Sequence, residues 1–318
     1  MDSRFLERAL ELAERGRGTT HTNPIVGAVL VADGQIVSEG WHERRGEPHA
    51  EIVALDAAGE RARGATMYVT LEPCAHHGAT PPCAGALIAA GVARAVVGQS
   101  DPHPEHGGGL ERMRESGIEV ELADGEIGFR CRQQIEEWRT SVTLGRPFVT
   151  YKVAVTLDGR VTKPGARWVS GEDSRRLVHV LRAQSDAVAV GMGTVRWDDP
   201  RLDAREVPVA RQPRRLAFGR GPLPEGSELE LRSGPLAQEL EALAGEGVQS
   251  LLLEGGPTIA AAFLEEGLVD KLLVFVAPAL SGEGSGMLAG LPRPLALSRL
   301  EARPVGEDIL IQAYVHEP

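Results

Sequence analysis

The sequence has few of the features that would place it among disulfide-stabilised, membrane or nucleic-acid-binding proteins. Only three of its 318 residues are cysteine, too few for a disulfide framework. No apolar run approaches the roughly 20 residues that span a bilayer, so we expect a cytoplasmic protein without membrane association. Acidic residues outnumber basic ones, and the resulting net charge of −11 disfavours binding to the phosphates of nucleic acids.

The order of apolar and turn segments predicts two α/β domains. In the first, a β-hairpin turning at Asp33 and Gly34 is followed by alternating helices and strands, which is typical of a three-layer α/β/α sandwich. We place the boundary at Arg146 and Pro147, which gives a domain of residues 1–145 and a second of residues 146–318. In the first domain the predicted strands after the hairpin are 66–71, 94–98 and 118–122, and the predicted helices are a surface helix in 1–16 and the helices 50–59, 81–91 and 128–145.

The second domain alternates strands and helices again. Its least regular part is 203–234, which is rich in proline, glycine and charge. The predicted strands are 148–161, 186–191, 214–218, 250–256 and 271–280, and the predicted helices are 170–184, which we expect to be capped, 235–245 and 257–268.

A histidine and two cysteines near strand–helix junctions predict a catalytic zinc site. His49 opens one predicted helix, Cys74 follows a strand, and Cys83 opens the next helix. One imidazole and two thiolates leave the fourth tetrahedral position for water, whose pKa bound zinc lowers to about 7. Glu51, two residues after His49, can stand beside the metal without binding it and can move protons.

These four residues also match a known signature. His-x-Glu followed by Pro-Cys and a second Cys is typical of the zinc deaminases that act on nucleobases. That signature has two residues between the cysteines, whereas eight separate Cys74 from Cys83. Taken singly, a His near a Glu at a helix start is more often a capped surface residue, and two such cysteines are more often buried thiols. Their order and shared placement favour zinc.

The long cysteine spacing resembles the metal loop of the bifunctional riboflavin-biosynthesis deaminase–reductases. The segments HAE, TLEPCAHHGATPPC, NPIVGAVLV and DPHP carry this resemblance. It implies a cytidine-deaminase-like domain in which Glu51 passes protons to a ring nitrogen and then to the leaving amine. Family members usually have Lys or Arg at the position of Ala79 and Asn at the position of His103. The implied pocket for the pyrimidine and its ribose phosphate is lined by Asn23, His42, His76 and Asp101, although turn or capping roles stay open for Asn23 and Asp101.

The second domain has no G-x-G-x-x-G fingerprint after its first strand. It does have Gly255 and Gly256 between a strand and a helix, a turn at which backbone N–H groups can approach an anion. A second glycine turn, VGMGTV, covers 190–195. Each of these turns, taken alone, is more commonly just a tight connection.

Four segments in order over 152–270 resemble the reductase half of the same family: KVAVTLDGRV, RWVSGED, HVLRAQSDAVAVGMGTVRWDDPRL and EGGPTIAAAFLEEGLVD. The resemblance implies a dihydrofolate-reductase-like α/β domain that uses NADPH. The implied NADPH contacts are Ala154, Trp168, Thr194, Asp198, Gly256, Pro257, Thr258, Ile259, Ala260, Ala261 and Ala262. The implied substrate contacts are Lys152, Arg182, Leu202, Arg205 and Glu254, with ion pairing as the alternative role of the three cations.

Three features of this half depart from the family pattern. Ala166 stands where a substrate-binding Ser is common, Phe218 stands where an acid often ends the central strand, and 203–250 is compressed.

Together the resemblances imply two consecutive reactions. The first is zinc-dependent hydrolytic deamination of 2,5-diamino-6-(5-phosphoribosylamino)pyrimidin-4(3H)-one. The second is NADPH-dependent reduction of the ribosyl side chain of 5-amino-6-(5-phosphoribosylamino)uracil to ribityl. We expect a homo-oligomer whose partners are small molecules. Two alternatives stay open: a zinc deaminase of another base, nucleoside or tRNA with an unrelated C-terminal module, and a non-catalytic zinc-stabilised scaffold.

Overall fold

The computed structural model describes residues 2–76, 82–103 and 106–318. The chain forms two compact units, the first ending at Leu144 and the second running from Gly145 to Glu317. Ala79, noted above for its departure from the family pattern, lies outside the described residues.

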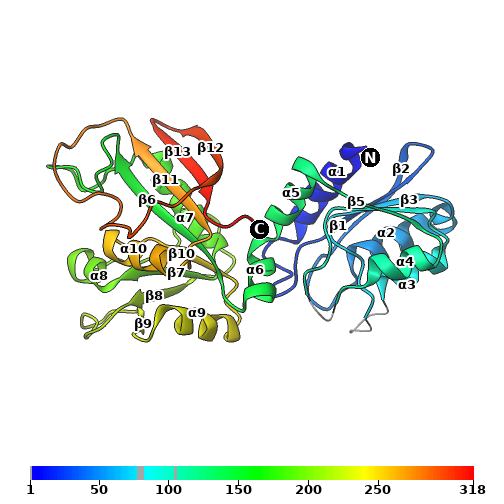
Figure 1. Cartoon of the computed structure of the whole chain (residues 1–318), viewed down its shortest axis with the longest axis horizontal. Coiled ribbons are helices and arrows are strands. Elements are labelled where there is room, and N and C mark those ends of the chain that lie inside the picture. Colours follow the sequence, from blue (N-terminus) through cyan, green and yellow to red (C-terminus); the bar gives the residue numbers. More distant parts are fainter. Residues whose placement is uncertain (1, 77–81, 104–105) are drawn as a thin grey trace. The chain divides into compact units, whose positions relative to one another are not determined.

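The first unit is built on a five-stranded mixed sheet in the order β2-β1-β3-β4-β5 (Figure 1). The hairpin expected at Asp33 and Gly34 is confirmed, because β1 and β2 pair antiparallel on either side of these residues. The strands β3, β4 and β5 are parallel to one another. The strands are β1 (Gly27–Ala32), β2 (Gln35–Trp41), β3 (Thr66–Val69), β4 (Arg94–Val97) and β5 (Glu119–Leu122).

Helices cover both faces of this sheet, so the three-layer architecture is confirmed. On one face, buried side chains of α2, α3 and α4 pack against the sheet in a single apolar cluster. On the other face, α1 supplies Leu6, Ala9 and Leu12 to a second cluster, against which Ile127 of α5 also packs. The helices are α1 (Ser3–Ala13), α2 (Ala50–Ala58), α3 (Cys83–Ala90), α4 (Gly109–Glu115), α5 (Gly125–Gln134) and α6 (Glu136–Leu144), with short 3-10 turns at Glu14–Gly16 and Gly59–Ala62.

A glycine in β2 lets α2 lie very close to the sheet. A Cβ atom added at Gly40 would come within 2.3 Å of the Ala50 carbonyl oxygen, a distance that real side chains do not tolerate. The start of α2, which carries His49 and Glu51, is thereby fixed against the sheet.

The second unit is built on an eight-stranded sheet in the order β12-β13-β11-β6-β10-β7-β8-β9. Six strands, from β11 to β9 in this order, are parallel, and β13 and β12 extend one edge antiparallel. The strands are β6 (Phe148–Thr156), β7 (Ala187–Gly191), β8 (Arg214–Phe218), β9 (Glu230–Arg232), β10 (Ser250–Leu253), β11 (Lys271–Ala277), β12 (Ser298–Val305) and β13 (Asp308–Tyr314).

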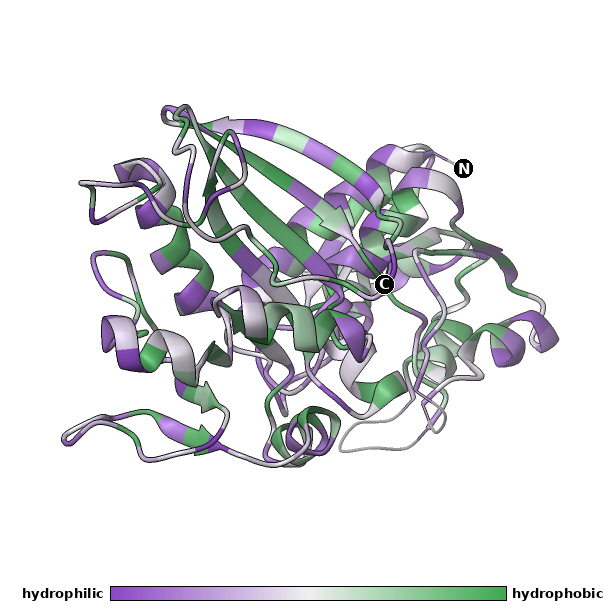
Figure 2. Ribbon diagram, turned by 60° about the vertical axis from the view of Figure 1, so that its left-hand side comes forward, coloured by the Kyte–Doolittle hydropathy of each residue, from purple (hydrophilic) through white to green (hydrophobic). Residues whose placement is uncertain are grey.

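The helices of this unit also cover two faces of their sheet. α9 (Leu236–Gly245) and α10 (Pro257–Glu265) pack on the largest apolar cluster, whereas α7 (Glu172–Gln184) packs on the opposite face; α8 (Met192–Asp198) follows β7. Figure 2 shows the result as largely hydrophobic central strands and an edge strand of mixed character.

Several predicted elements have different bounds in the structure. The predicted helix over 128–145 is divided between α5 and α6 at Ile135, and the strand predicted over 148–161 ends at Thr156. α7 has no side-chain cap at its start, since its N-cap residue is Gly171, whose N–H donates to the buried Asp308 carboxylate. The glycine turn over 190–195 contains the start of α8 rather than a loop alone. The sequence reading missed α4, β9, β12 and β13.

Candidate active sites

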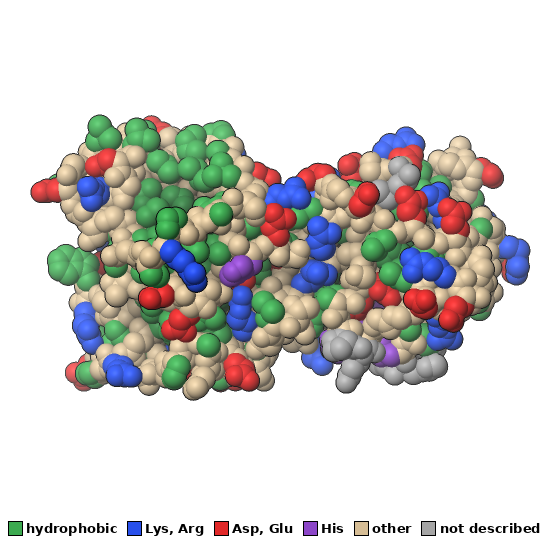
Figure 3. Space-filling model, viewed as in Figure 1, with side chains coloured by type: hydrophobic (Ala, Val, Ile, Leu, Met, Phe, Trp, Pro, Cys, Tyr) green, Lys and Arg blue, Asp and Glu red, His purple; other side chains and the backbone are tan. Residues whose placement is uncertain are grey.

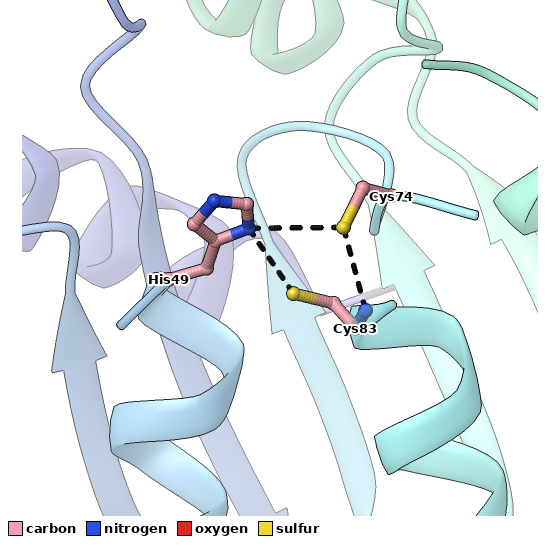
Figure 4. Close-up of side chains that lie close together, drawn as sticks. All are labelled: His49, Cys74 and Cys83. Carbon is pink, nitrogen blue, oxygen red and sulfur yellow. Dashed lines mark hydrogen bonds between the residues drawn. The ribbon is translucent and has the colours of Figure 1, made fainter. Parts of the chain in front are cut away.

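The three predicted zinc ligands lie together at one edge of the first sheet. His49 immediately precedes α2, Cys83 is the first residue of α3, and Cys74 lies in the loop after β3. Figure 4 shows the three side chains pointing toward one another. His49 Nδ1 is 3.2 Å from Cys83 Sγ and 3.7 Å from Cys74 Sγ, and all three candidate ligand atoms lie within 4.8 Å of one another.

These separations fit a tetrahedral zinc ion. Zinc–sulfur bonds of about 2.3 Å and zinc–nitrogen bonds of about 2.0 Å place neighbouring ligand atoms about 3.5 Å apart. One imidazole and two thiols are also the donor set of a catalytic rather than a structural zinc site. His49, Cys74 and Cys83 can therefore hold the metal without rearrangement of the fold.

The start of α3 prepares one thiol for metal binding. The Cys83 backbone N–H donates to Cys74 Sγ at 3.4 Å. Hydrogen bonding from Cys83, opposed by burial and assisted by His49, lowers the pKa of Cys74 to about 4. A hydrogen bond between the two thiol side chains, together with burial, raises the pKa of the Cys83 thiol. These contacts favour the thiolate form of Cys74, which is the form that ligates metals.

Glu51 lies beside these ligands with only 3% of its surface exposed. Burial raises the pKa of its carboxyl group, while the nearby His49 opposes this effect. A raised pKa moves a carboxyl group toward the range in which a general acid–base residue works.

A cavity of about 240 Å³ opens next to the ligands. Its lining includes His49, Cys74 and Glu51. It also includes every residue predicted to line the pyrimidine pocket: Asn23, His42, His76 and Asp101.

Two of the predicted pocket residues are linked to each other. His42 Nδ1 lies 3.2 Å from the Pro48 carbonyl oxygen, and since a carbonyl oxygen only accepts, this nitrogen carries the proton. His42 Nε2 is then free to accept from the Asn23 side-chain amide, 3.4 Å away. Burial lowers the pKa of His42, which favours this neutral form.

Asp101 lines the cavity and also has the turn role that the sequence left open for it. Its carboxylate accepts from the His103 N–H at 2.8 Å, which holds the local turn, and burial raises its pKa. Its backbone N–H donates to Glu72 at 2.9 Å, and Glu72 accepts again from the Leu110 N–H at 3.1 Å. The Glu72 carboxylate thus ties down both ends of the segment that carries Asp101.

Sequence reasoning missed eight residues that line this cavity: Pro24, Val26, Gly46, Glu47, Leu71, Glu72, His106 and Trp138. Glu72 belongs to the TLEPC segment and Trp138 to α6, the last helix of the first unit, but neither has a local pattern that indicates a pocket. His106 also lines the cavity, and its ring stacks between those of His76 and His103, with centroids 4.1 and 3.7 Å away. The histidine-rich composition of 76–106 was the one available signal.

In the second unit, three of the predicted substrate residues form one buried ion-pair cluster. Arg182 donates to both oxygens of Glu254 at 2.6 and 3.0 Å, and Lys152 Nζ donates to the same carboxylate at 3.3 Å. Burial opposes ionisation of Glu254, but Lys152 and Arg182 outweigh it and lower its pKa to about 2. The stability that this ionised carboxylate contributes is therefore present above its unfolded pKa and is lost only as the pH falls toward 2.

The two remaining predicted substrate residues lie on the segment that follows α8. Leu202 is buried in an apolar cluster, and Arg205 pairs with the Asp203 carboxylate at 2.6 Å. Arg182 reaches this segment by donating to the Asp203 carbonyl oxygen at 3.1 Å. Each cation thus forms an ion pair, and contact with substrate stays a prediction.

Two predicted cofactor segments meet where adjacent parallel strands end. β7 leads into α8 and β10 into α10, and these two strands are hydrogen-bonded neighbours. Thr194 Oγ1 lies 3.4 Å from where a Cβ of Gly256 would be, so the two helix starts are in contact. A side chain at Gly255 would clash with Ile259 at 2.1 Å, which explains a glycine at the second position before α10.

The other predicted cofactor residues have varied surroundings. Ala154 is half-buried on β6, Asp198 is exposed at the end of α8, and Ala260 is buried against the sheet. Trp168 is 52% exposed, with the guanidinium groups of Arg167 and Arg175 over its ring.

In the second unit, the two single-residue departures from the family pattern are Ala166 and Phe218, and each has a simple structural role. Ala166 is exposed in a turn closed by its N–H and the Lys163 carbonyl oxygen. Phe218 packs edge-on against Phe263 in the core, with ring centroids 5.3 Å apart.

Comparisons with known proteins match both halves. The family model for the cytidine and deoxycytidylate deaminase zinc-binding region matches residues 1–99, and that for the RibD C-terminal domain matches residues 147–311. The riboflavin biosynthesis protein RibD of Aquifex aeolicus is 39% identical over 350 residues, and that of Escherichia coli is 38% identical over 368 residues. Each alignment covers 98% of both chains.

Two solved structures are similar over 98% of both chains. Acinetobacter baumannii RibD (form 1) has a TM-score of 0.85 at 35% identity. A diaminohydroxyphosphoribosylaminopyrimidine deaminase/5-amino-6-(5-phosphoribosylamino)uracil reductase from Thermotoga maritima has a TM-score of 0.82 at 33% identity. The expected deaminase-like and reductase-like folds are thereby confirmed, and the alternative of an unrelated C-terminal module is contradicted.

The assignment of the metal site predicts that substituting a ligand cysteine, but not Cys131, removes zinc from the protein. Replacing Cys74 or Cys83 with Ser removes a thiolate ligand, so the zinc content should fall from about one ion per chain to a small fraction of that value. Metal analysis of the dialysed full-length protein measures this. Cys131→Ser is the matched control, because Cys131 is buried in α5 and is not one of the three ligands. Full zinc retention in both ligand variants would contradict the assignment.

Proposed function

The chain belongs to the RibD family of riboflavin biosynthesis proteins, and on that premise we propose how its two units divide the reactions. It is a bifunctional enzyme, a zinc-dependent deaminase and an NADPH-dependent reductase. Residues 1–145 deaminate 2,5-diamino-6-(5-phosphoribosylamino)pyrimidin-4(3H)-one. Residues 146–318 then reduce the ribosyl side chain of 5-amino-6-(5-phosphoribosylamino)uracil to ribityl.

One observation carries the assignment of the deaminase site. The metal ligands His49 and Cys74 and the buried Glu51 line the same cavity as the residues predicted to bind the pyrimidine. When bound, zinc supplies a Lewis acid that lowers the pKa of a coordinated water to about 7. Glu51 takes a proton from the attacking water on its carboxylate and passes it to a ring nitrogen. It then takes the remaining proton of the added hydroxyl group and passes it to the amine, which leaves as ammonia while the C=O bond forms.

The remaining side chains orient the substrate. Asn23 and the neutral His42 present amide and imidazole groups to the polar edge of the pyrimidine, while the apolar faces of Leu71 and Trp138 border the cavity. Asp101, held by Glu72, is placed to accept from ribose hydroxyl groups. These contacts hold the ring carbon next to the water that Glu51 deprotonates.

In the reductase unit the chain mainly orients cofactor against substrate. NADPH supplies the hydride when it is bound. The start of α10 and the neighbouring Thr194 offer backbone N–H groups and a hydroxyl group to its phosphates, as helix N-termini commonly do. Lys152, Arg182 and Glu254 form a buried charged cluster on the α7 side of the sheet, in which the two cations can attract the substrate phosphate.

We further propose a cytoplasmic protein that does not bind nucleic acid. The three cysteines form no disulfide among the described residues, and two of them are the candidate metal ligands, as is usual for a reducing compartment. The net charge of −11 opposes binding to phosphate backbones. Within the described residues, no helix is long and apolar enough to cross a membrane.

The exposed edge of the second sheet supports a homo-oligomer. Figure 3 shows hydrophobic side chains gathered on the viewed face of this unit. Leu300 on the edge strand β12 is 67% exposed, and Ile309 on β13 is 42% exposed. Apolar residues on an open sheet edge are typical of an interface.

Replacing Leu300 with Glu should therefore shift the mass measured by light scattering toward that of the monomer, because a charge would be buried in the interface. Leu144→Glu is the matched control, since Leu144 is 60% exposed and belongs to the first unit. A wild-type chain that is monomeric at micromolar concentration would contradict the proposal.

Replacing Glu51 with Gln should separate the two activities. The amide cannot accept and return a proton, so ammonia release should fall by about 10²–10⁴-fold, while the zinc content stays unchanged. Reduction of preformed deaminated substrate should continue at the wild-type rate. Normal ammonia release by Glu51→Gln would contradict the proton role.

A side chain at Gly193 tests the cofactor site. Apart from its chain neighbours and the backbone of its own helix, a Cβ added there meets no protein atom within 4 Å, so we expect the side chain to obstruct a bound ligand rather than the fold. Gly193→Val should raise the NADPH dissociation constant by about tenfold or more, equivalent to about 1.4 kcal/mol, with an unchanged melting temperature. Gly245→Val at the end of α9 is the control, because its Cβ also meets open space. Equal NADPH affinity in both variants would contradict the placement.

A further inference from the structure

The segment that carries Leu202 and Arg205 has an unusual backbone. Asp199, Leu202 and Glu206 have φ angles of +40°, +55° and +62°. Residues other than Gly, Asn and Asp rarely adopt this left-handed conformation unless their surroundings hold them in it. Two such residues, Leu202 and Glu206, flank the short stretch 203–205. The conformation of this stretch must therefore be imposed by contacts from outside it.

Three contacts impose it. Leu202 is 2% exposed and is held by the apolar cluster that includes Val188 and Leu252. Arg182 donates to the Asp203 carbonyl oxygen at 3.1 Å. The third contact is made by the side chain of Gln212, just before β8.

The Gln212 carboxamide binds both backbone polar groups of Ala204. Its Oε1 accepts from the Ala204 N–H at 2.9 Å, and its Nε2 donates to the Ala204 carbonyl oxygen at 2.7 Å. A neighbouring strand would offer the same pair of groups. A carboxamide carries both a donor and an acceptor, whereas a carboxylate of the same shape only accepts. Gln212 therefore holds the residue midway between the two left-handed positions.

We propose that Gln212 is a positioning residue of the reductase, which holds 202–206 so that Leu202 and Arg205 meet the ribosylamine substrate. The inference rests on the proposed function, since it takes these two residues as substrate contacts. Gln212 precedes Pro213 and the paired strand β8, so it ties the segment to a rigid part of the sheet. No hydrogen bond described for Gln212 involves the cofactor segments at the starts of α8 and α10.

The proposal predicts a change in substrate binding without a change in cofactor binding. The variants are Gln212→Ala, which removes both hydrogen bonds, and Gln212→Glu, which keeps the size and the acceptor but loses the donor. Using the full-length holoenzyme with NADPH and the deaminated substrate, we expect KM for that substrate to rise about tenfold in both variants. The kcat should stay within about twofold, and the NADPH dissociation constant and melting temperature should match the wild type.

Gln238→Ala is the matched control, because Gln238 is exposed on α9 and lies outside this segment. It should leave every measured parameter unchanged. A wild-type KM in both Gln212 variants would overturn the proposal, as would an effect confined to the melting temperature or to NADPH affinity.

Hydrogen exchange separates this inference from the proposed function. Amides of 202–206 should exchange faster in Gln212→Ala than in the wild type, whether or not the chain turns over substrate. A wild-type chain that does not oxidise NADPH would contradict the proposed function. Unchanged exchange over 202–206 would overturn the inference, whatever the activity.

Discussion

The deaminase half depends on one geometric constraint: three ligand atoms from separate segments must meet beside a buried carboxyl group. His49 and Cys83 satisfy it because α2 and α3 begin at the same edge of one sheet. Gly40 keeps α2 close to that sheet, and the N–H at the start of α3 stabilises the Cys74 thiolate. The catalytic geometry is therefore a consequence of where two helices begin, and the cavity next to it needs only a few side chains to define a substrate.

The reductase half depends on a different constraint, because three charged side chains, Lys152, Arg182 and Glu254, are largely buried together. Glu254 is almost fully buried, yet it stays ionised because Lys152 and Arg182 donate to it. Removing either cation would leave part of that charge without compensation, which is costly in a buried place. The same Arg182 also binds the segment that carries Arg205, so the charged cluster and the substrate segment form one connected unit.

Features set by local sequence could be predicted, whereas features set by distant contacts could not. The hairpin at Asp33 and Gly34 and the metal ligands are encoded within short segments whose residue types limit the alternatives. In contrast, Trp138 and Glu72 reach the cavity only through the packing of the sheet, and Gln212 acts on a residue eight positions earlier in an irregular stretch. The edge strand β12 and its neighbour β13 were also not predicted, since neither sequence shows a clear alternation of apolar and polar residues.

The central claim is that one chain carries two separate sites, of which only the first needs zinc. The most direct measurement follows ammonia release and NADPH oxidation separately in one sample supplied with the phosphoribosyl diaminopyrimidine, before and after chelation of the metal. Chelation should stop both signals, and adding the deaminated product should restore NADPH oxidation alone. Ammonia release that survives metal removal, or NADPH oxidation that still fails with the deaminated product, would contradict the account.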